Sequence, residues 1–140
     1  MARVILDTGV LVRGFRGQLD AAAISDEDDV SLPAVVVAEY LAGVLIDSDP
    51  ARKAAQRGFL DRILDATPVE DYTVAVAEHH AALLAHVRAA GQPRGAHDLI
   101  IAATARATGR LLLTTDTRAR FDELPEVQAR VLQPLGDPLR

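Results

Sequence analysis

The sequence predicts an α/β domain of three layers, with a central, mostly parallel sheet of four to five strands and helices on both of its faces. Two observations favour this class. Short aliphatic runs of strand length alternate with longer, alanine-rich stretches of helical length along the chain. Aromatic residues make up only 4% of the sequence, so the core must consist of Ala, Val, Leu and Ile, which suits a sheet covered by small-residue helices.

In the first half of the chain, strands and helices are expected in alternation. Gly14 and Gly17 are placed to end the first helix, and Pro33 suits the first position of the next helix, where its missing N–H is not needed. Asp49 and Pro50 are typical of an N-cap followed by a first-turn proline. The expected strands are 2–6, 30–32 and 67–69, and the expected helices are 10–15, 33–46 and 50–64.

The second half of the chain continues the alternation. An alanine-rich helix ends at Gly91, with Pro93 just beyond it, and another helix is closed by Gly109. The expected helices are 74–90 and 96–108, and the expected strands are 110–114 and 127–132. Strands that alternate with helices predict parallel strand pairing.

Length and composition set further bounds. A chain of 140 residues fits one domain with a substantial core, which we expect over 1–134, followed by a loose tail over 135–140. The absence of cysteine excludes a disulfide framework and a thiolate metal site. We see no targeting peptide and no run of ~18 apolar residues, so we expect a cytoplasmic protein with no membrane partner. The net charge of -5 argues against broad adhesion to nucleic acid, but not against a nucleic-acid enzyme whose site carries metal cations.

Four acidic residues fall where the carboxyl ends of strands should meet. Asp7 directly follows the first strand and interrupts the apolar run VILDTGVLV, and Asp116 follows the strand RLLLT with one residue between. Asp98 lies in the first turn of the 96–108 helix, and Glu39 lies about two turns into the helix that leaves the second strand. Sites in open parallel sheets lie outside the carboxyl ends of the strands, so one edge could gather all four acids.

Carboxylates gathered in one pocket repel one another and lose hydration, which raises their pKa values or recruits a cation. The only lysine, Lys53, is expected on a polar helix away from these segments. Oxygen-only ligands suit Mg²⁺ or Mn²⁺, and such ions can orient a water and stabilise a phosphoryl leaving group. The residues therefore predict a site for Mg²⁺ or Mn²⁺ at this edge.

The stretches VILDTGVLV, LPAVVVAEYLAG and GAHDLIIAATARATGRLLLTTDTRARF, in this order and spacing, resemble PIN-domain ribonucleases, and more narrowly the VapC toxins of bacterial VapBC toxin–antitoxin pairs. The resemblance covers about residues 3 to 132 and implies a PIN-like fold. It implies that Thr8 and Thr115 line the pocket and orient water or a carboxylate. Asn commonly follows Asp-Thr in the family, whereas this chain has Gly9, which suits a tight turn. The metal-binding, catalytic residues that the resemblance implies are Asp7, Glu39, Asp98 and Asp116.

The function implied by the resemblance is a Mg²⁺- or Mn²⁺-dependent endoribonuclease, the toxin component of a type II toxin–antitoxin module. A water activated by the metal would attack phosphorus in line. The implied partners are an RNA substrate, a cognate VapB-like antitoxin and a second copy of the chain in a homodimer. In such proteins the antitoxin tail lies in a groove formed by early helices, and the candidate groove here lies on the apolar face of 33–46 and the helix 50–64.

Other interpretations of these residues remain open. A receiver-like domain would need paired acids after the first strand and a lysine near its end, and a haloacid-type phosphatase would need Asp-x-Asp where this chain has Asp-Thr-Gly. A P-loop or dinucleotide fold needs a glycine pattern that DTGVLVRG lacks. An antitoxin-binding α/β module without nuclease activity is the further alternative. The presence of all four acids favours the enzyme.

The four acids and the residues that flank them also allow other roles. Any single acid of this kind can instead be a helix cap or a turn residue, and Asp116 is expected to cap the next short helix as well. His97 precedes Asp98, but its side chain should point elsewhere on the helix. Several arginines on flanking segments are candidates to hold RNA phosphates. They are Arg13, Arg16, Arg94, Arg118 and Arg120.

Overall fold

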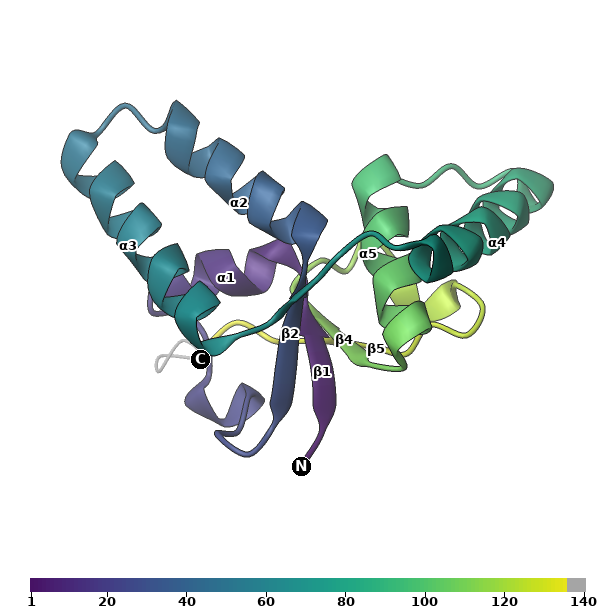
Figure 1. Cartoon of the computed structure of the whole chain (residues 1–140), viewed down its shortest axis with the longest axis horizontal. Helices are drawn as coiled ribbons and strands as arrows, with labels where there is room; N and C mark the ends of the chain where they lie inside the picture. Colours follow the sequence, from purple (N-terminus) through teal and green to yellow (C-terminus); the bar gives the residue numbers. More distant parts are fainter. Residues whose placement is uncertain (136–140) are drawn as a thin grey trace.

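A computed structural model of the chain describes residues 1–135 (Figure 1). Its strands are β1 (Arg3–Leu6), β2 (Asp29–Pro33), β3 (Val69–Glu70), β4 (Leu111–Thr114) and β5 (Ala129–Val131). They form a five-stranded sheet in the order β3-β2-β1-β4-β5, and every pairing is parallel. The predicted parallel sheet is thus confirmed, and of the four to five strands expected it has five.

Helices cover both faces of this sheet. They are α1 (Thr8–Phe15), α2 (Ala34–Ile46), α3 (Pro50–Ala66), α4 (Val74–Ala90) and α5 (Ala96–Thr108), with two short 3₁₀ helices, η1 (Ala21–Ala23) and η2 (Phe121–Glu123). Figure 1 shows α1, α2 and α3 on one side of the sheet and α4 and α5 on the other. The predicted three-layer architecture is confirmed.

The strand order explains which helix covers which face. The chain moves outward from β1 to β2 and β3, and then returns to place β4 on the other side of β1. Because crossovers between parallel strands are right-handed, this reversal puts α4 and α5 on the face opposite α1 to α3. The order therefore reverses between β1 and β4, and the carboxyl ends of these two strands lie at the topological switch point of the sheet.

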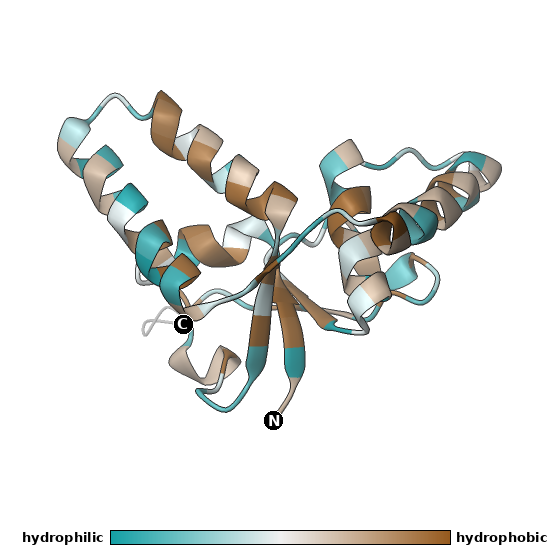
Figure 2. Ribbon diagram, in the orientation of Figure 1, coloured by the Kyte–Doolittle hydropathy of each residue, from teal (hydrophilic) through white to brown (hydrophobic). Residues whose placement is uncertain are grey.

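The core is aliphatic and centred on the middle strands. Ile5, Leu32 and Leu112 have no exposed surface, and on α5 the small side chains of Ala102 and Ala103 are equally buried. The small alanines let α5 pack closely on the sheet. Figure 2 shows β1 as hydrophobic beyond its first residue, β2 as mostly hydrophobic with a paler band in its middle, and a more polar α3 at the outside.

Most predicted boundaries hold within a few residues, and the exceptions have local causes. The first helix begins at Thr8 because the Asp7 side chain caps it. Pro33 was expected to be the first residue of a helix, and this expectation is wrong. It is the last residue of β2, where it pairs with Glu70 of β3. Of the expected tail 135–140, residues 136–140 lie outside the described residues. No helix within 1–135 combines the length and apolar character needed to cross a membrane.

Candidate functional site

Asp7 is a buried carboxylate that links the end of β1 to the start of α1. Its backbone N–H donates to the Leu113 carbonyl of β4 at 2.9 Å, and its Oδ1 accepts the Thr8 N–H at 2.8 Å. Its Oδ2 accepts the Thr114 hydroxyl at 2.7 Å. Burial raises the pKa of Asp7, the two hydrogen bonds oppose that rise, and the nearby charges of Glu39 and Asp116 add to it. The charge is tolerated in the apolar run because each oxygen has a partner.

Thr114, the last residue of β4, joins two of the acids. Its hydroxyl donates to Asp7 and accepts the Asp116 N–H at 3.0 Å, and the residue is only 1% exposed. Sequence reasoning selected the neighbouring Thr115 and missed Thr114. The signal was available: a hydroxyl that ends the strand LLLT, beside a strand that ends in an acid, has a buried carboxylate within reach.

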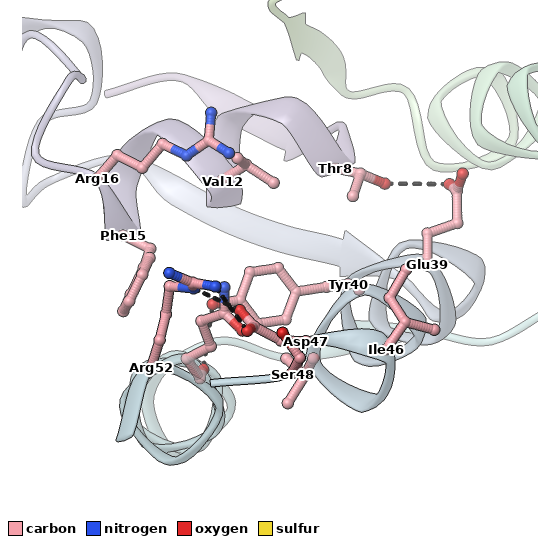
Figure 3. A pocket seen from close by; sticks show the side chains of 13 residues that line it. Thr8, Val12, Phe15, Arg16, Glu39, Tyr40, Ile46, Asp47, Ser48 and Arg52 are labelled. Carbon is pink, nitrogen blue, oxygen red and sulfur yellow. Dashed lines mark hydrogen bonds and ion pairs between the residues drawn. The ribbon is translucent and has the colours of Figure 1, made fainter. Parts of the chain in front are cut away.

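Asp98 and Glu39 approach the same edge from helices. Asp98 is half-buried in the first turn of α5, and its pKa is raised mainly by burial and then by the charges of Asp7, Asp116 and Glu39. Glu39, on α2, accepts the Thr8 hydroxyl at Oε1 over 3.0 Å (Figure 3). The three other acids are thus near enough to Asp98 to act on its carboxyl, and the structure brings all four to one edge.

Asp116 lies just beyond β4 and is exposed. Its Oδ1 accepts the backbone N–H groups of Arg118 and Ala119 at 2.7 and 3.2 Å. The expected cap of the next short helix is wrong in detail, because η2 begins only at Phe121 and has no side-chain cap. Asp116 instead closes the turn that carries it, which fixes its position at the strand end.

The two predicted hydroxyls have different surroundings. Thr8 contacts Glu39, as described, whereas Thr115 lies against Gly9. A Cβ atom on Gly9 would stand 2.0 Å from the Thr115 hydroxyl oxygen. Gly9 lies inside α1 and is not among the residues with a positive φ, so the tight-turn explanation is wrong. The glycine is needed because the first turn of α1 packs directly against residue 115.

The acids are near one another without forming a closed coordination shell. Within residues 1–135, no group of three or more His, Asp or Glu side chains is close enough to hold a metal ion. Each of three acids is held by its own partner. Thr8 holds Glu39, Thr114 holds Asp7, and the 116–119 turn holds Asp116. The donor set itself, four carboxylates, has the chemistry that hard divalent cations prefer.

His97 and Arg94 depart from the expectations for flanking residues. His97 does not point away from the pocket, because its Nδ1 lies 3.5 Å from Oε2 of Glu39. Arg94 is no phosphate-binding candidate, since its buried guanidinium donates to the carbonyls of Ala119 and Arg120 and pairs with Glu123 at 3.5 Å.

The other flanking arginines fall into two groups. Arg13 donates to the Leu132 carbonyl at 2.9 Å, and Arg120 pairs with Glu123 at 3.5 Å. Arg16 and Arg118 are exposed.

A groove of about 690 Å³ opens beside Glu39, lined by residues of α1, α2 and α3 (Figure 3). At its far end Arg52 binds Asp47 through two hydrogen bonds of 2.6 and 2.8 Å, which hold the pKa of Asp47 down at about 2. Gly43 lines the groove, and a Cβ there would meet nothing within 4 Å. The apolar lining residues are Val12, Phe15, Tyr40, Val44 and Ile46.

Comparison with known proteins agrees with this architecture. A ribonuclease VapC of Rickettsia bellii (strain RML369-C) is 25% identical over 134 residues, which cover 96% of this chain and 98% of that protein. The solved structure of VapBC-5 from Mycobacterium tuberculosis is 28% identical with a TM-score of 0.79, over 94% of this chain and 100% of that one. FitAcB from Neisseria gonorrhoeae is 27% identical with a TM-score of 0.77, over 90% and 95%.

The fold is also shared with a more distant structure. VapBC2 from Rickettsia felis, bound to a DNA fragment from its promoter, is 20% identical with a TM-score of 0.82, over 94% of this chain and 99% of that one. The PIN domain family model matches residues 4–127. The resemblance drawn from the sequence is confirmed, and the chain belongs to the PIN-domain family.

Proposed function

We propose that this protein is a Mg²⁺- or Mn²⁺-dependent endoribonuclease and the toxin component of a VapBC-type toxin–antitoxin module. The observation that carries the proposal is the set of four carboxylates at the switch point of the sheet, two of which have raised pKa values. Perturbed carboxyl groups gathered at such a site are typical of catalytic centres. The similarity to a ribonuclease VapC along almost the whole chain supports the same activity.

The residues fit a hard divalent cation by their donor chemistry. The uncompensated charges around Asp7 and Asp98 are what a cation would neutralise. When bound, the ion activates water and stabilises the charge that develops on the phosphate and its leaving group. The residues proposed to hold it are Asp7, Glu39, Asp98 and Asp116.

Neighbouring hydroxyls prepare these ligands. Thr114 and the Thr8 N–H fix both oxygens of Asp7, so little reorganisation remains for it when charge enters the site. The Thr8 hydroxyl orients Glu39, whose half-exposed carboxylate is the ligand that α2 contributes to the proposed set. Thr115, packed against Gly9, holds the loop that carries Asp116 close to α1.

A fluorogenic RNA assay tests the activity. EDTA should abolish cleavage and Mg²⁺ or Mn²⁺ should restore it, while Ca²⁺, larger and less strict in geometry, should bind but support little cleavage. Asp98→Asn should remove the activity without unfolding the protein, and Asp61→Asn, on the exposed face of α3, should retain it. Full cleavage in EDTA, or an active Asp98 variant, contradicts the proposal.

The RNA assay, run beside acetyl phosphate labelling and a binding test, separates the alternative functions. A receiver-like domain should be labelled by acetyl phosphate and should leave RNA intact. An antitoxin-binding module without nuclease activity should bind its partner but cleave nothing with any metal.

The proposed partners are a VapB-like antitoxin and a second copy of the chain. VapBC assemblies among the structural relatives support an antitoxin, and the groove between α1, α2 and α3 is the surface we assign to it. Its apolar lining suits an amphipathic segment, and Glu39 at one end suits a basic side chain on that segment.

Groove-filling variants test this assignment. Gly43→Phe should place a ring in the open groove and prevent rescue of growth by the co-expressed antitoxin, while RNA cleavage persists. Ala54→Phe is the matched control, because Ala54 is exposed and lies about 200° around α3 from the groove residues Arg52 and Gln56. Equal rescue of both variants contradicts the groove assignment. A strict monomer by light scattering, with no stable complex with the protein encoded next to it, contradicts both partners.

A further inference from the structure

Within the described part of the chain, His97 is the one cation-forming side chain that pairs with any of the four acids. Among the ion pairs within residues 1–135, only the pair between His97 Nδ1 and Glu39 Oε2, at 3.5 Å, involves any of them. The imidazole is carried by the first turn of α5, immediately before Asp98. Its side chain is 60% exposed, whereas that of Glu39 is 32% exposed. The imidazole is therefore the more exposed member of the pair.

The Glu39 carboxylate is held from two directions. Thr8, on α1, donates its hydroxyl to Oε1 at 3.0 Å, and His97, on α5, faces Oε2. Glu39 itself comes from α2, so three helices converge on one carboxyl group. A glutamate side chain has three rotatable bonds, and contacts at both oxygens restrict it to a small part of its conformational range.

We propose that His97 is a positioning residue for Glu39, which holds the carboxylate beside Asp98 so that it can serve as a ligand of the divalent cation. The inference rests on the proposed metal-dependent function. In this role His97 acts through Glu39 and is not itself a proposed ligand of the ion. Nδ1 lies 3.5 Å from Oε2, so a small approach of the ring would let a neutral imidazole with its proton on Nδ1 donate to that oxygen. Each carboxylate oxygen can accept more than one partner, so Oε2 stays available to a cation.

The effect to expect is a loss of metal affinity. Partners that orient metal-ligating side chains typically change metal affinity by about 10- to 100-fold when removed. His97→Ala should therefore weaken Mn²⁺ binding by about 10-fold, at the lower end because Thr8 still holds Oε1. His97→Gln keeps an N–H donor and should retain most of the affinity. Cleavage at saturating Mn²⁺ should remain close to wild type, with the loss confined to the Mn²⁺ concentration required.

The experiment is a Mn²⁺ titration of the full-length protein, followed by calorimetry and by the Mn²⁺-dependent rise in melting temperature. His86→Ala is the matched control, since His86 is an exposed histidine on α4. A double-mutant cycle gives the sharpest readout: in a Glu39→Gln background, His97→Ala should cause no further loss of affinity, because its effect passes through the Glu39 carboxylate.

The outcomes are separable. Unchanged or tighter Mn²⁺ binding by His97→Ala overturns the positioning role, as does a loss of equal size in the Glu39→Gln background. Failure of the wild-type protein to bind Mn²⁺ overturns the proposed metal-dependent function, and this inference with it. If the wild-type protein binds Mn²⁺ and His97→Ala binds it equally well, the nuclease proposal stays intact and only the role of His97 is removed.

Discussion

The inner pair of acids, Asp7 and Asp98, and the outer pair, Glu39 and Asp116, are stabilised in different ways. Burial raises the pKa of both inner carboxyl groups. Glu39 is partly exposed and held by side chains of two helices, while Asp116 is exposed and held by its own turn. The cost of bringing four negative charges together is therefore concentrated at the inner pair. Stability and activity should separate when single acids are replaced.

The largest expected effect contrasts one acid of each pair. Asp98→Asn and Asp116→Asn should each lower RNA cleavage by more than about 100-fold. Loss of a residue that merely orients a metal ligand costs up to about 100-fold, and loss of a ligand itself should cost more. Only Asp98→Asn should raise the melting temperature without metal, because it removes a desolvated charge. Asp116→Asn should not raise it, since its carboxylate is exposed and accepts two backbone N–H groups. Equal changes in melting temperature would break the division into two pairs.

The pH dependence of stability sharpens the same contrast. The folded-state pKa values of Asp7 and Asp98 lie above the ordinary value of 3.8, so these groups favour the fold below about pH 3.8. That contribution is lost as the pH rises through the raised pKa values. The unfolding free energy of Asp98→Asn should therefore increasingly exceed that of wild type as the pH rises from 3.8, until Asp98 is ionised. Urea titrations at several pH values measure this difference, and a constant difference contradicts it.

Thr114→Val tests how the inner pair tolerates burial. The valine removes the hydroxyl that donates to Asp7 and accepts the Asp116 N–H. The free energy of unfolding should fall by about 1–3 kcal/mol, and RNA cleavage should also fall. Thr117→Val, at an exposed position of the following turn, should change stability by less than about 0.5 kcal/mol. Denaturant unfolding of both variants decides whether the Thr114 hydroxyl matters.

The smallest effect concerns the contact that brings α1 to the loop of Asp116. Gly9→Ala forces the Thr115 hydroxyl out of its place and should cost about 1 kcal/mol for the displaced rotamer. Adding Thr115→Ala should recover most of that loss, because the remaining Cβ atom lies at 3.4 Å. A double variant no more stable than Gly9→Ala would show that the strain arises elsewhere.

Much of this architecture could be predicted because it follows from local patterns. Uninterrupted aliphatic runs gave strands, glycines at 91 and 109 ended helices in the left-handed conformation, and Asp49 capped α3 through two backbone N–H groups. Parallel pairing then follows from the alternation of strands and helices, and places Asp7 and Asp116 at one edge. The convergence of the acids was thus a consequence of topology.

What escaped prediction depends on contacts between distant segments. The role of Thr114 requires the register of β1 against β4, and the contact of His97 with Glu39 requires the packing of α2 near α5. Gly9 was assigned to a turn because glycine often supplies a positive φ, whereas the structure uses it for lack of a side chain beside Thr115. Residue type narrowed these choices, and only tertiary geometry could decide them.

The reversal of strand order between β1 and β4 also bears on when the site can form during synthesis. Asp7 and the threonine that fixes it are 107 residues apart in the chain, and their strands are joined directly. A ribosome completes the first three strands and all five α-helices, α1 to α5, before it reaches Thr114, the partner of Asp7. Contacts between residues far apart in the sequence form late and slowly in folding. A growing chain therefore carries Asp7 before the burial and the Thr114 hydrogen bond that shift its pKa are in place. The buried environment of Asp7 is therefore completed only when most of the chain has been made.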